Sequence, residues 1–239
     1  MSKQQVEAQK KSAPTARNPI FRLNKGVILT TRKIEDCSRV ENYMHFATLV
    51  HKINLYLLEY KNLSEVETIL DIVYSEKLVN NIIDFVTNTD YFCNFGLRLL
   101  EHFCILDKAR KFIEEGDIFY IMLGLLRTND NETTVSALSF LSLLLTTKNT
   151  KPILSKVKIL PLLVKLLKTK DIEYVFFIID IISKCDTKSL ISQGTIDVLK
   201  EIESSEDFIM LPDILRKCSL IRKELETYQT LTNNEETKQ

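Results

Sequence analysis

Two eight-residue stretches that are nearly alike, 41 residues apart, most constrain how this chain can fold. LGLLRTND ends at Asp130 and VKLLKTKD ends at Asp171. Two related stretches, NIIDFVTNTD and DVLKEIESSED, end at Asp90 and Asp207, so the four ends are 40, 41 and 36 residues apart. A repeat of this period indicates stacked units, because one such unit cannot bury its own apolar face.

Each stretch has the periodicity of a helix. Leu162 and Leu163 lie one turn before Leu166 and Leu167, and the other stretches have similar pairs. Each then ends in a polar segment whose acidic residue can accept hydrogen bonds from the free N–H groups of a following helix. Longer segments follow that are apolar over most of their circumference, and we expect helices there that are covered on several sides. They span residues 91–106, 133–145 and 172–184.

A third, shorter element completes each unit, at residues 107–117, 149–158 and 186–195. Two of these elements end near Gly116 and Gly194, and glycine suits the left-handed residue that terminates a helix. The whole chain has only 5 Gly and 5 Pro. This scarcity of turn residues favours helices joined by short loops over a sandwich or barrel of strands.

Three helices in about forty residues resemble the armadillo repeat, and KARKFIEEGDIFYIMLGLLRTND is similar to its pattern of short helix, glycine and apolar helix. HEAT repeats, which have two helices, are the competing family. The resemblance covers residues 63–225 and implies an all-α, right-handed α-solenoid of armadillo-like three-helix repeats. We expect capping helices at both ends, since terminal repeats need a polar outer face.

The sequence predicts three regions. Residues 1–35, which contain Pro14 and Pro19, are expected to form a flexible basic arm. Residues 36–228 are expected to form the helical domain, beginning with a helix over 36–61 that Asp36 caps, and ending with a helix that has Pro212 in its first turn. Residues 229–239 are expected to be a polar, disordered tail. The arm carries the basic residues Arg17, Arg22, Lys25, Arg32 and Lys33.

No catalytic or cofactor motif is present, so we predict a protein that is not an enzyme, with no cofactor, metal or small-molecule substrate. The chain has no Walker loop, no G-x-G-x-x-G, no G-x-S-x-G and no H-E-x-x-H. Its five cysteines include no C-x-x-C, and those in apolar segments (Cys93, Cys104 and Cys185) are predicted core residues. The longest apolar run, residues 174–182, is too short to span a bilayer and contains Asp180.

The resemblance implies a partner-binding groove lined by the third helix of each repeat. Armadillo proteins that bind extended basic peptides carry a Trp and an Asn four residues apart there, and this chain has no Trp. Its groove is expected to be polar at one end and apolar further along, although the simpler interpretation of Arg98 and His102 is polarity on a solvated face. The groove residues are Arg98, Glu101, His102, Ser139, Leu143, Ile179 and Ser183.

Although the net charge of the chain is zero, one segment is rich in lysine. Between Thr133 and Lys170 there are seven lysines and no Asp or Glu. Such a cluster can hold an acidic partner, and it is equally consistent with a solvated edge that keeps the protein soluble. We expect the basic rim of the groove to consist of Lys148, Lys151, Lys156 and Lys158.

The function expected from these features is a non-enzymatic scaffold or adaptor in a multiprotein assembly, such as a cytoskeletal or ciliary one. Its partners would be proteins with an acidic surface, and its compartment the cytoplasm, with cytoskeletal or nuclear association. Two alternatives stay open: an armadillo-type nucleotide-exchange cofactor of a heat-shock ATPase, and a peripheral nucleic-acid-binding subunit. The absence of arginine and of interleaved aromatic residues in the lysine cluster gives nucleic acid little support.

Overall fold

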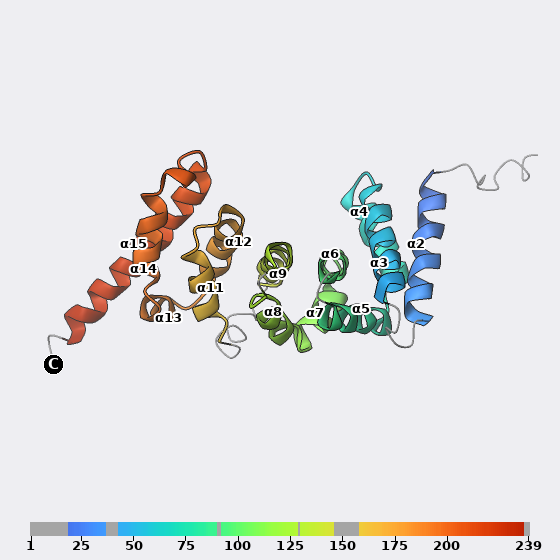
Figure 1. The fold of residues 1–239 in the computed structure, drawn as a ribbon, viewed down its shortest axis with the longest axis horizontal. Helices are drawn as coiled ribbons and strands as arrows, with labels where there is room; N and C mark the ends of the chain where they lie inside the picture. The colour runs from blue at the N-terminus through green and yellow to red at the C-terminus, as the bar shows by residue number, and fades with distance from the viewer. Residues whose placement is uncertain (1–18, 37–42, 90–91, 129, 146–157, 237–239) are drawn as a thin grey trace, which may run out of the picture. The chain divides into compact units, whose positions relative to one another are not determined.

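The described part of the chain is built from α-helices. The computed structural model describes residues 19–36, 43–89, 92–128, 130–145 and 158–236. Within these ranges it has 13 α-helices, one short 3-10 helix and no strand (Figure 1). The prediction of an all-helical fold is therefore confirmed for the described residues.

Two compact units divide the chain, residues 1–109 and 110–239. The helices of the first unit are α2 (Pro19–Asp36), α3 (Tyr43–Leu58), α4 (Leu63–Val73), α5 (Glu76–Asn88) and α6 (Cys93–Phe103). Helix α7 (Asp107–Glu115) crosses the boundary. The helices of the second unit are α8 (Ile118–Leu125), α9 (Asn131–Leu144), α11 (Leu160–Leu167), α12 (Ile172–Ile182), α13 (Thr187–Ser192), α14 (Thr195–Glu203), the 3-10 helix η1 (Glu206–Phe208) and α15 (Pro212–Glu236).

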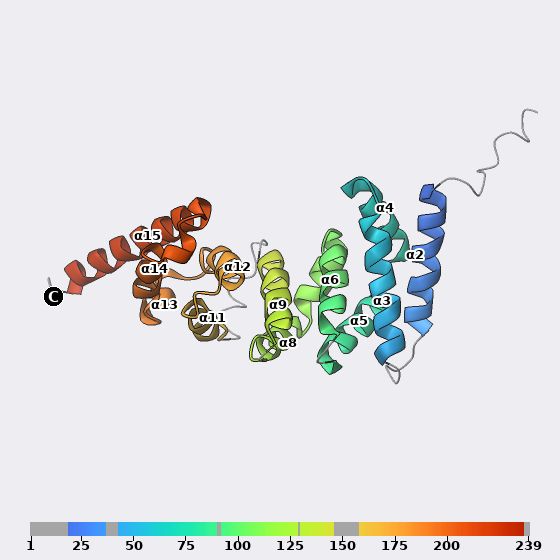
Figure 2. The same cartoon turned by 45° about the horizontal axis from the view of Figure 1, so that its top comes forward.

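Helix α2 is an integral part of the first unit. It lies alongside α3 in both views and also contacts α4 and α5 (Figures 1 and 2). Val27 and Ile34 are fully buried. The Tyr60 hydroxyl donates to Asn24 Oδ1 at 2.7 Å, and the Asn81 side-chain amide donates to the carbonyl of Ile34 at 3.0 Å. These contacts hold the helix along its length.

The structure thus differs from the prediction of a flexible arm over residues 1–35. Residues 19–35 are helical and packed, and residues 1–18 lie outside the described residues. The helix buries a narrow stripe around Val27, Thr31 and Ile34, and its other faces are polar or half-exposed. Its stability comes from contact with α3, which is a tertiary effect that local composition does not reveal.

The first helix of the predicted domain begins later than expected. The sequence predicts a helix over residues 36–61 with Asp36 as its cap, whereas Asp36 ends α2 and α3 runs from Tyr43 to Leu58. Residues 37–42 lie outside the described residues. The apolar spacing itself is confirmed, because Ala47, Val50, Ile53 and Leu57 are all buried.

The core of the first unit lies between α3, α5 and α6. The rings of Phe46 and Phe85 stack with their centroids 4.7 Å apart. Gly96 allows α6 to approach α5, since a Cβ atom at this position would lie 2.5 Å from Cγ2 of Val86. The buried amide of Asn54 donates to the carbonyl of Phe95 at 2.9 Å and ties α3 to α6.

In the second unit, α12 contacts α9, α11 and α15, and α14 packs on α15. The apolar run over residues 174–182 forms a helix with Val175, Ile178 and Ile182 fully buried, as predicted, although Phe176 is 56% exposed. The cysteine predictions hold for Cys93 and Cys104, which are buried, whereas Cys185 is half-buried.

The predicted helix caps are confirmed at two of the four repeat ends. Asp130 accepts the backbone N–H three residues later at 2.8 Å, which begins α9. Asp171 accepts the backbone N–H of Glu173 and of Tyr174, which begins α12. Asp207 instead lies inside the 3-10 helix, and Asp90 lies outside the described residues. A carboxylate at the start of a helix is a local signal, which explains why the sequence shows it.

The two predicted glycine termini differ. Gly194, between α13 and α14, has φ 70°, as predicted. Gly116 follows α7 but is not in the left-handed region. Its N–H donates to the carbonyl of Ile113 at 3.3 Å, so the helix ends there by a tightened last turn rather than by a reversal of φ.

The C-terminal helix has Pro212 in its first turn, as predicted, and runs from Pro212 to Glu236. The prediction of a disordered tail over residues 229–239 therefore does not hold for residues 229–236, and residues 237–239 lie outside the described residues. Residues 227–231 are all exposed, so this end of α15 projects from the rest of the second unit (Figure 1).

Candidate functional site

A basic face on α2 is the most distinctive surface of the first unit. Leu29 lies at its centre with 48% of its surface exposed. Because an α-helix turns 100° per residue, the surrounding basic residues all lie within about 60° of Leu29. We call this the α2 basic surface, and it consists of Leu29 with the exposed residues Arg22, Lys25, Arg32 and Lys33.

The charges of this surface are largely uncompensated within the unit. Lys25, Arg32 and Lys33 form no ion pair with any described residue. Glu35 is turned away from it and accepts a hydrogen bond from the Ser75 hydroxyl at the start of α5. Asp36, the last residue of α2, brings an exposed carboxylate to the same face. The arm residue Arg17 lies outside the described residues.

The predicted groove residues of the first unit lie on α6. Arg98 is exposed, and Glu101 and His102 are half-buried. Burial lowers the pKa of the His102 imidazole, which favours its neutral form at neutral pH. These three residues share one helix, so their proximity follows from sequence spacing alone.

The predicted groove residues of the second unit lie on α9 and α12. Ser139 and Leu143 are half-buried on α9, Ile179 is buried on α12, and Ser183 is exposed at the end of α12. The Ser183 hydroxyl donates to the carbonyl of Asp180 at 2.7 Å. The predicted groove residues of the second unit thus lie on two helices that contact one another. Ile179, however, is only 1% exposed, so it is mainly a core residue.

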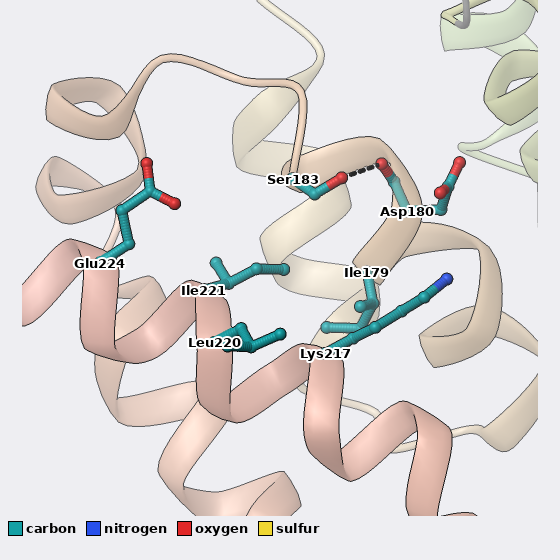
Figure 3. A pocket seen from close by; sticks show the side chains of 7 residues that line it. All are labelled: Ile179, Asp180, Ser183, Lys217, Leu220, Ile221 and Glu224. Atoms are coloured by element: carbon teal, nitrogen blue, oxygen red, sulfur yellow. Dashed lines mark hydrogen bonds between the residues drawn. The ribbon is translucent and has the colours of Figure 1, made fainter.

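A hollow of about 260 Å³ lies between α12 and α15 (Figure 3). Ile179 and Ile221 contribute apolar surface from the two helices, and Lys217 and Glu224 bring opposite charges from α15. The sequence reasoning missed the α15 residues because it assigned this helix to capping. The missed signal is their spacing of three, four and seven residues, which places Lys217, Leu220, Ile221 and Glu224 on one side of the helix.

A polar network beside this hollow ties α9 to α12. The Ser142 hydroxyl donates to Asp180 Oδ2 at 2.7 Å, and Lys184 Nζ lies 2.6 Å from the same oxygen. Burial raises the pKa of Asp180, but the hydrogen bonds from Lys184 and Ser142, with the charges of Lys184 and Lys217, outweigh it. The pKa of Asp180 therefore lies below its usual value, and the residue is a carboxylate at neutral pH.

The predicted basic rim is described only in part. Lys158 is exposed and adopts φ 54°, and Lys148, Lys151 and Lys156 lie outside the described residues. Among the described residues, no group of three or more His, Cys, Asp or Glu side chains is arranged to hold a metal ion. None of the described helices combines the length and the apolar character that crossing a membrane requires.

Comparison with known proteins bears on the fold alone. No protein-family model matches this sequence, and no curated protein matches it. Two similar solved structures are crystal structures of engineered proteins from the Northeast Structural Genomics Consortium. One is 12% identical with a TM-score of 0.58, covering 95% of this chain and 100% of its own. The other is 16% identical with a TM-score of 0.52, covering 89% and 93%. At such low identity the similarity supports the helical fold only.

Proposed function

We propose that this protein is a non-enzymatic adaptor that binds an acidic surface of a partner protein through the α2 basic surface. The observation that carries the proposal is the docking of α2 on α3, which turns four basic side chains to one face around an exposed leucine. A free arm would display the same charges in no fixed arrangement. A docked helix has already lost that conformational freedom, so less entropy is lost on binding.

The chemistry of the surface defines the partner. Its basic residues extend from Arg22 to Lys33, about 16 Å along the helix axis. A partner with several carboxylates along a similar length, and one apolar residue opposite Leu29, would complement it. Charge complementarity of this kind accelerates association and weakens as salt concentration rises. Assemblies of cytoskeletal or ciliary type in the cytoplasm, where acidic protein surfaces are common, are the setting we propose.

Within the all-helical class, we propose that the fold is a right-handed solenoid of armadillo-like three-helix repeats. The order of helix lengths supports it. Helices α7, α8 and α9 have 9, 8 and 14 residues, and α13, α14 and α15 have 6, 9 and 25 residues. Each group thus ends in its longest helix, as the resemblance implies. Helices α4, α5 and α6, with 11, 13 and 11 residues, depart from this order.

Charge reversal on α2 tests the proposed function. Deleting residues 1–35 would remove the buried Val27 and Ile34 and unfold the first unit, so substitutions are the cleaner test. The double variant Lys25→Glu, Lys33→Glu changes two exposed residues. Native complexes are purified with the wild-type protein and with this variant, and the proteins recovered are identified by mass spectrometry. We expect the recovered amount of at least one partner with an acidic surface to be lower with the variant by about tenfold or more.

The matched control is Lys165→Glu with Lys168→Glu, which makes the same charge change at two exposed residues of the second unit. It should recover the partner as well as the wild type does. Equal recovery by both double variants, with the same sensitivity to salt, would refute the proposal. Loss of all captured proteins after nuclease treatment would favour the nucleic-acid alternative. If both double variants accelerate nucleotide exchange by a heat-shock ATPase to the same extent, the result would favour the exchange-cofactor alternative.

A further inference from the structure

The side of α15 that borders the hollow beside α12 carries charged and apolar residues in an order that complements itself when a second copy of the helix runs antiparallel. Lys217 and Glu224 lie seven residues apart, about 10 Å along the axis, with Leu220 and Ile221 midway between them (Figure 3). Asp213 and Tyr228 lie beyond these charges on the same side of the helix. Met210, just before α15, and Leu231, near its end, lie further out in each direction.

This side of the helix is only partly satisfied within the described part of the chain: Ile221 is buried, and a carboxylate oxygen of Asp213 lies 3.6 Å from the guanidinium of Arg216. Lys217 and Glu224 form no ion pair with any described residue. Met210 is 86% exposed, Leu220 62% and Leu231 59%. Residues 227–231, near the end of α15, are all exposed and are not covered by the rest of the second unit. Apolar surface of this extent around paired charges is typical of an interface.

We propose that α15 pairs antiparallel with α15 of a second copy of this chain, about a twofold axis that passes between Leu220 and Ile221. In such a dimer each contact occurs twice, because the same surface is used on both copies. Lys217 lies opposite Glu224 of the second copy, and Glu224 lies opposite its Lys217. Leu220 lies opposite Ile221 of the second copy, over the hollow between α12 and α15.

The same register accounts for both ends of the helix. Tyr228 lies opposite Asp213 of the second copy, where its hydroxyl can donate to the carboxylate. Leu231 lies opposite Met210 of the second copy, so these two exposed apolar residues cover one another. A parallel arrangement would place Lys217 against Lys217 and Glu224 against Glu224, and like charges in contact exclude it.

The charge pattern is also why we favour a second copy over another protein. A surface that complements its own reversed image closes a pair and leaves no free edge. The paired segment, from Met210 to Leu231, is about 32 Å long and one helix wide. A contact of this size is at the small end of stable interfaces, so we expect a dimer that dissociates in the micromolar range.

Sedimentation velocity of the full chain over a range of concentrations tests the pairing. The wild type should form dimers, whereas Lys217→Glu alone and Glu224→Lys alone should each raise the dissociation constant by about tenfold or more, because each puts two pairs of like charges in contact. Lys217 and Glu224 are exposed, so both variants should keep the circular dichroism spectrum of the wild type, and Glu224→Lys should keep its melting curve. Lys217→Glu should melt at a slightly lower temperature, because the charge of Lys217 acts on Asp180. Lys165→Glu and Glu67→Lys make the same charge changes elsewhere and should dimerise normally.

Mixing the two single variants is the decisive measurement. In the mixed pair, both contacts again join opposite charges, so the mixture should sediment as a dimer although each variant alone does not. The double variant Lys217→Glu, Glu224→Lys should also dimerise by itself. A wild type that stays monomeric at all concentrations, single variants that dimerise like the wild type, or a mixture that stays monomeric would each overturn the proposal. The pairing does not depend on the α2 basic surface, so charge reversal on α2 leaves the dimer unchanged.

Discussion

The close approach of α5 and α6 depends on the missing side chain of Gly96. A Cβ atom there would lie 2.5 Å from Cγ2 of Val86 and 3.1 Å from a ring carbon of Phe85, and both side chains are fully buried. We expect Gly96→Ala to lower the free energy of unfolding by about 1–3 kcal/mol, because the helices must separate or the core side chains must leave their rotamers. Urea denaturation followed by circular dichroism measures the change.

Gly124, in α8, is the matched control for this prediction. Nothing lies within 4 Å of a Cβ atom built on it. Gly124→Ala should therefore raise the free energy of unfolding by about 0.5–1 kcal/mol, since alanine restricts the unfolded chain and favours the helix. Equal effects at the two glycines would show that helix propensity, and not the contact of α5 with α6, determines the role of Gly96.

At the scale of secondary structure, the contact of α9 with α12 depends on the charge of one carboxylate. Asp180 accepts hydrogen bonds from Ser142 and Lys184, and its pKa is lower in the folded protein than its usual value near 3.8. A depressed folded pKa contributes stability above the unfolded pKa, and this stability is lost as pH falls through the folded pKa. We therefore expect Asp180→Asn to destabilise the protein at neutral pH and to reduce the loss of stability below about pH 4.

Urea denaturation at a series of pH values checks this expectation. Asp84→Asn is the control, because Asp84 is an exposed aspartate of α5 that forms no ion pair with a described residue. The control should keep the pH dependence of the wild type. If Asp180→Asn and Asp84→Asn have the same profile, the network between α9 and α12 does not contribute the stability that we assign to it.

At the scale of the whole molecule, the solenoid that we propose predicts an extended particle. A compact protein of this length has a radius of gyration of about 18 Å. A stack of repeats that contact only their neighbours is longer, so small-angle X-ray scattering of the monomeric variant Lys217→Glu should give a clearly larger value. Deleting residues 1–18 from this variant removes the contribution of that segment to the measured radius of gyration. A radius near 18 Å for this truncated variant would contradict a solenoid and favour a compact bundle.

Together the two proposals describe an adaptor with two equivalent binding surfaces. A dimer joined by α15 carries two copies of the α2 basic surface, and simultaneous binding of both to one assembly strengthens attachment without any new contact. Breaking the dimer with Lys217→Glu should then weaken attachment to the assembly, while leaving binding of the isolated partner unchanged.

The sequence by itself determined the local features of this protein. The helical periodicity, the caps at Asp130 and Asp171, the left-handed Gly194 and the start of α15 at Pro212 each depend on residues within one or two turns. Such features can be predicted because the backbone satisfies its hydrogen bonds and its φ preferences locally. The basic character of residues 22–33 was equally visible in the sequence.

Only the tertiary structure decided where those features lie. Helix α2 is stable because α3 buries Val27 and Ile34, so the basic residues of the expected arm became one ordered surface. The contact of α12 with α15 brought Lys217 and Glu224 beside Ile179 and Ser183, 34 to 45 positions earlier in the chain. Burial of a helix face depends on which other helix reaches it, and that pairing is set by packing between distant segments rather than by the residues of the face itself.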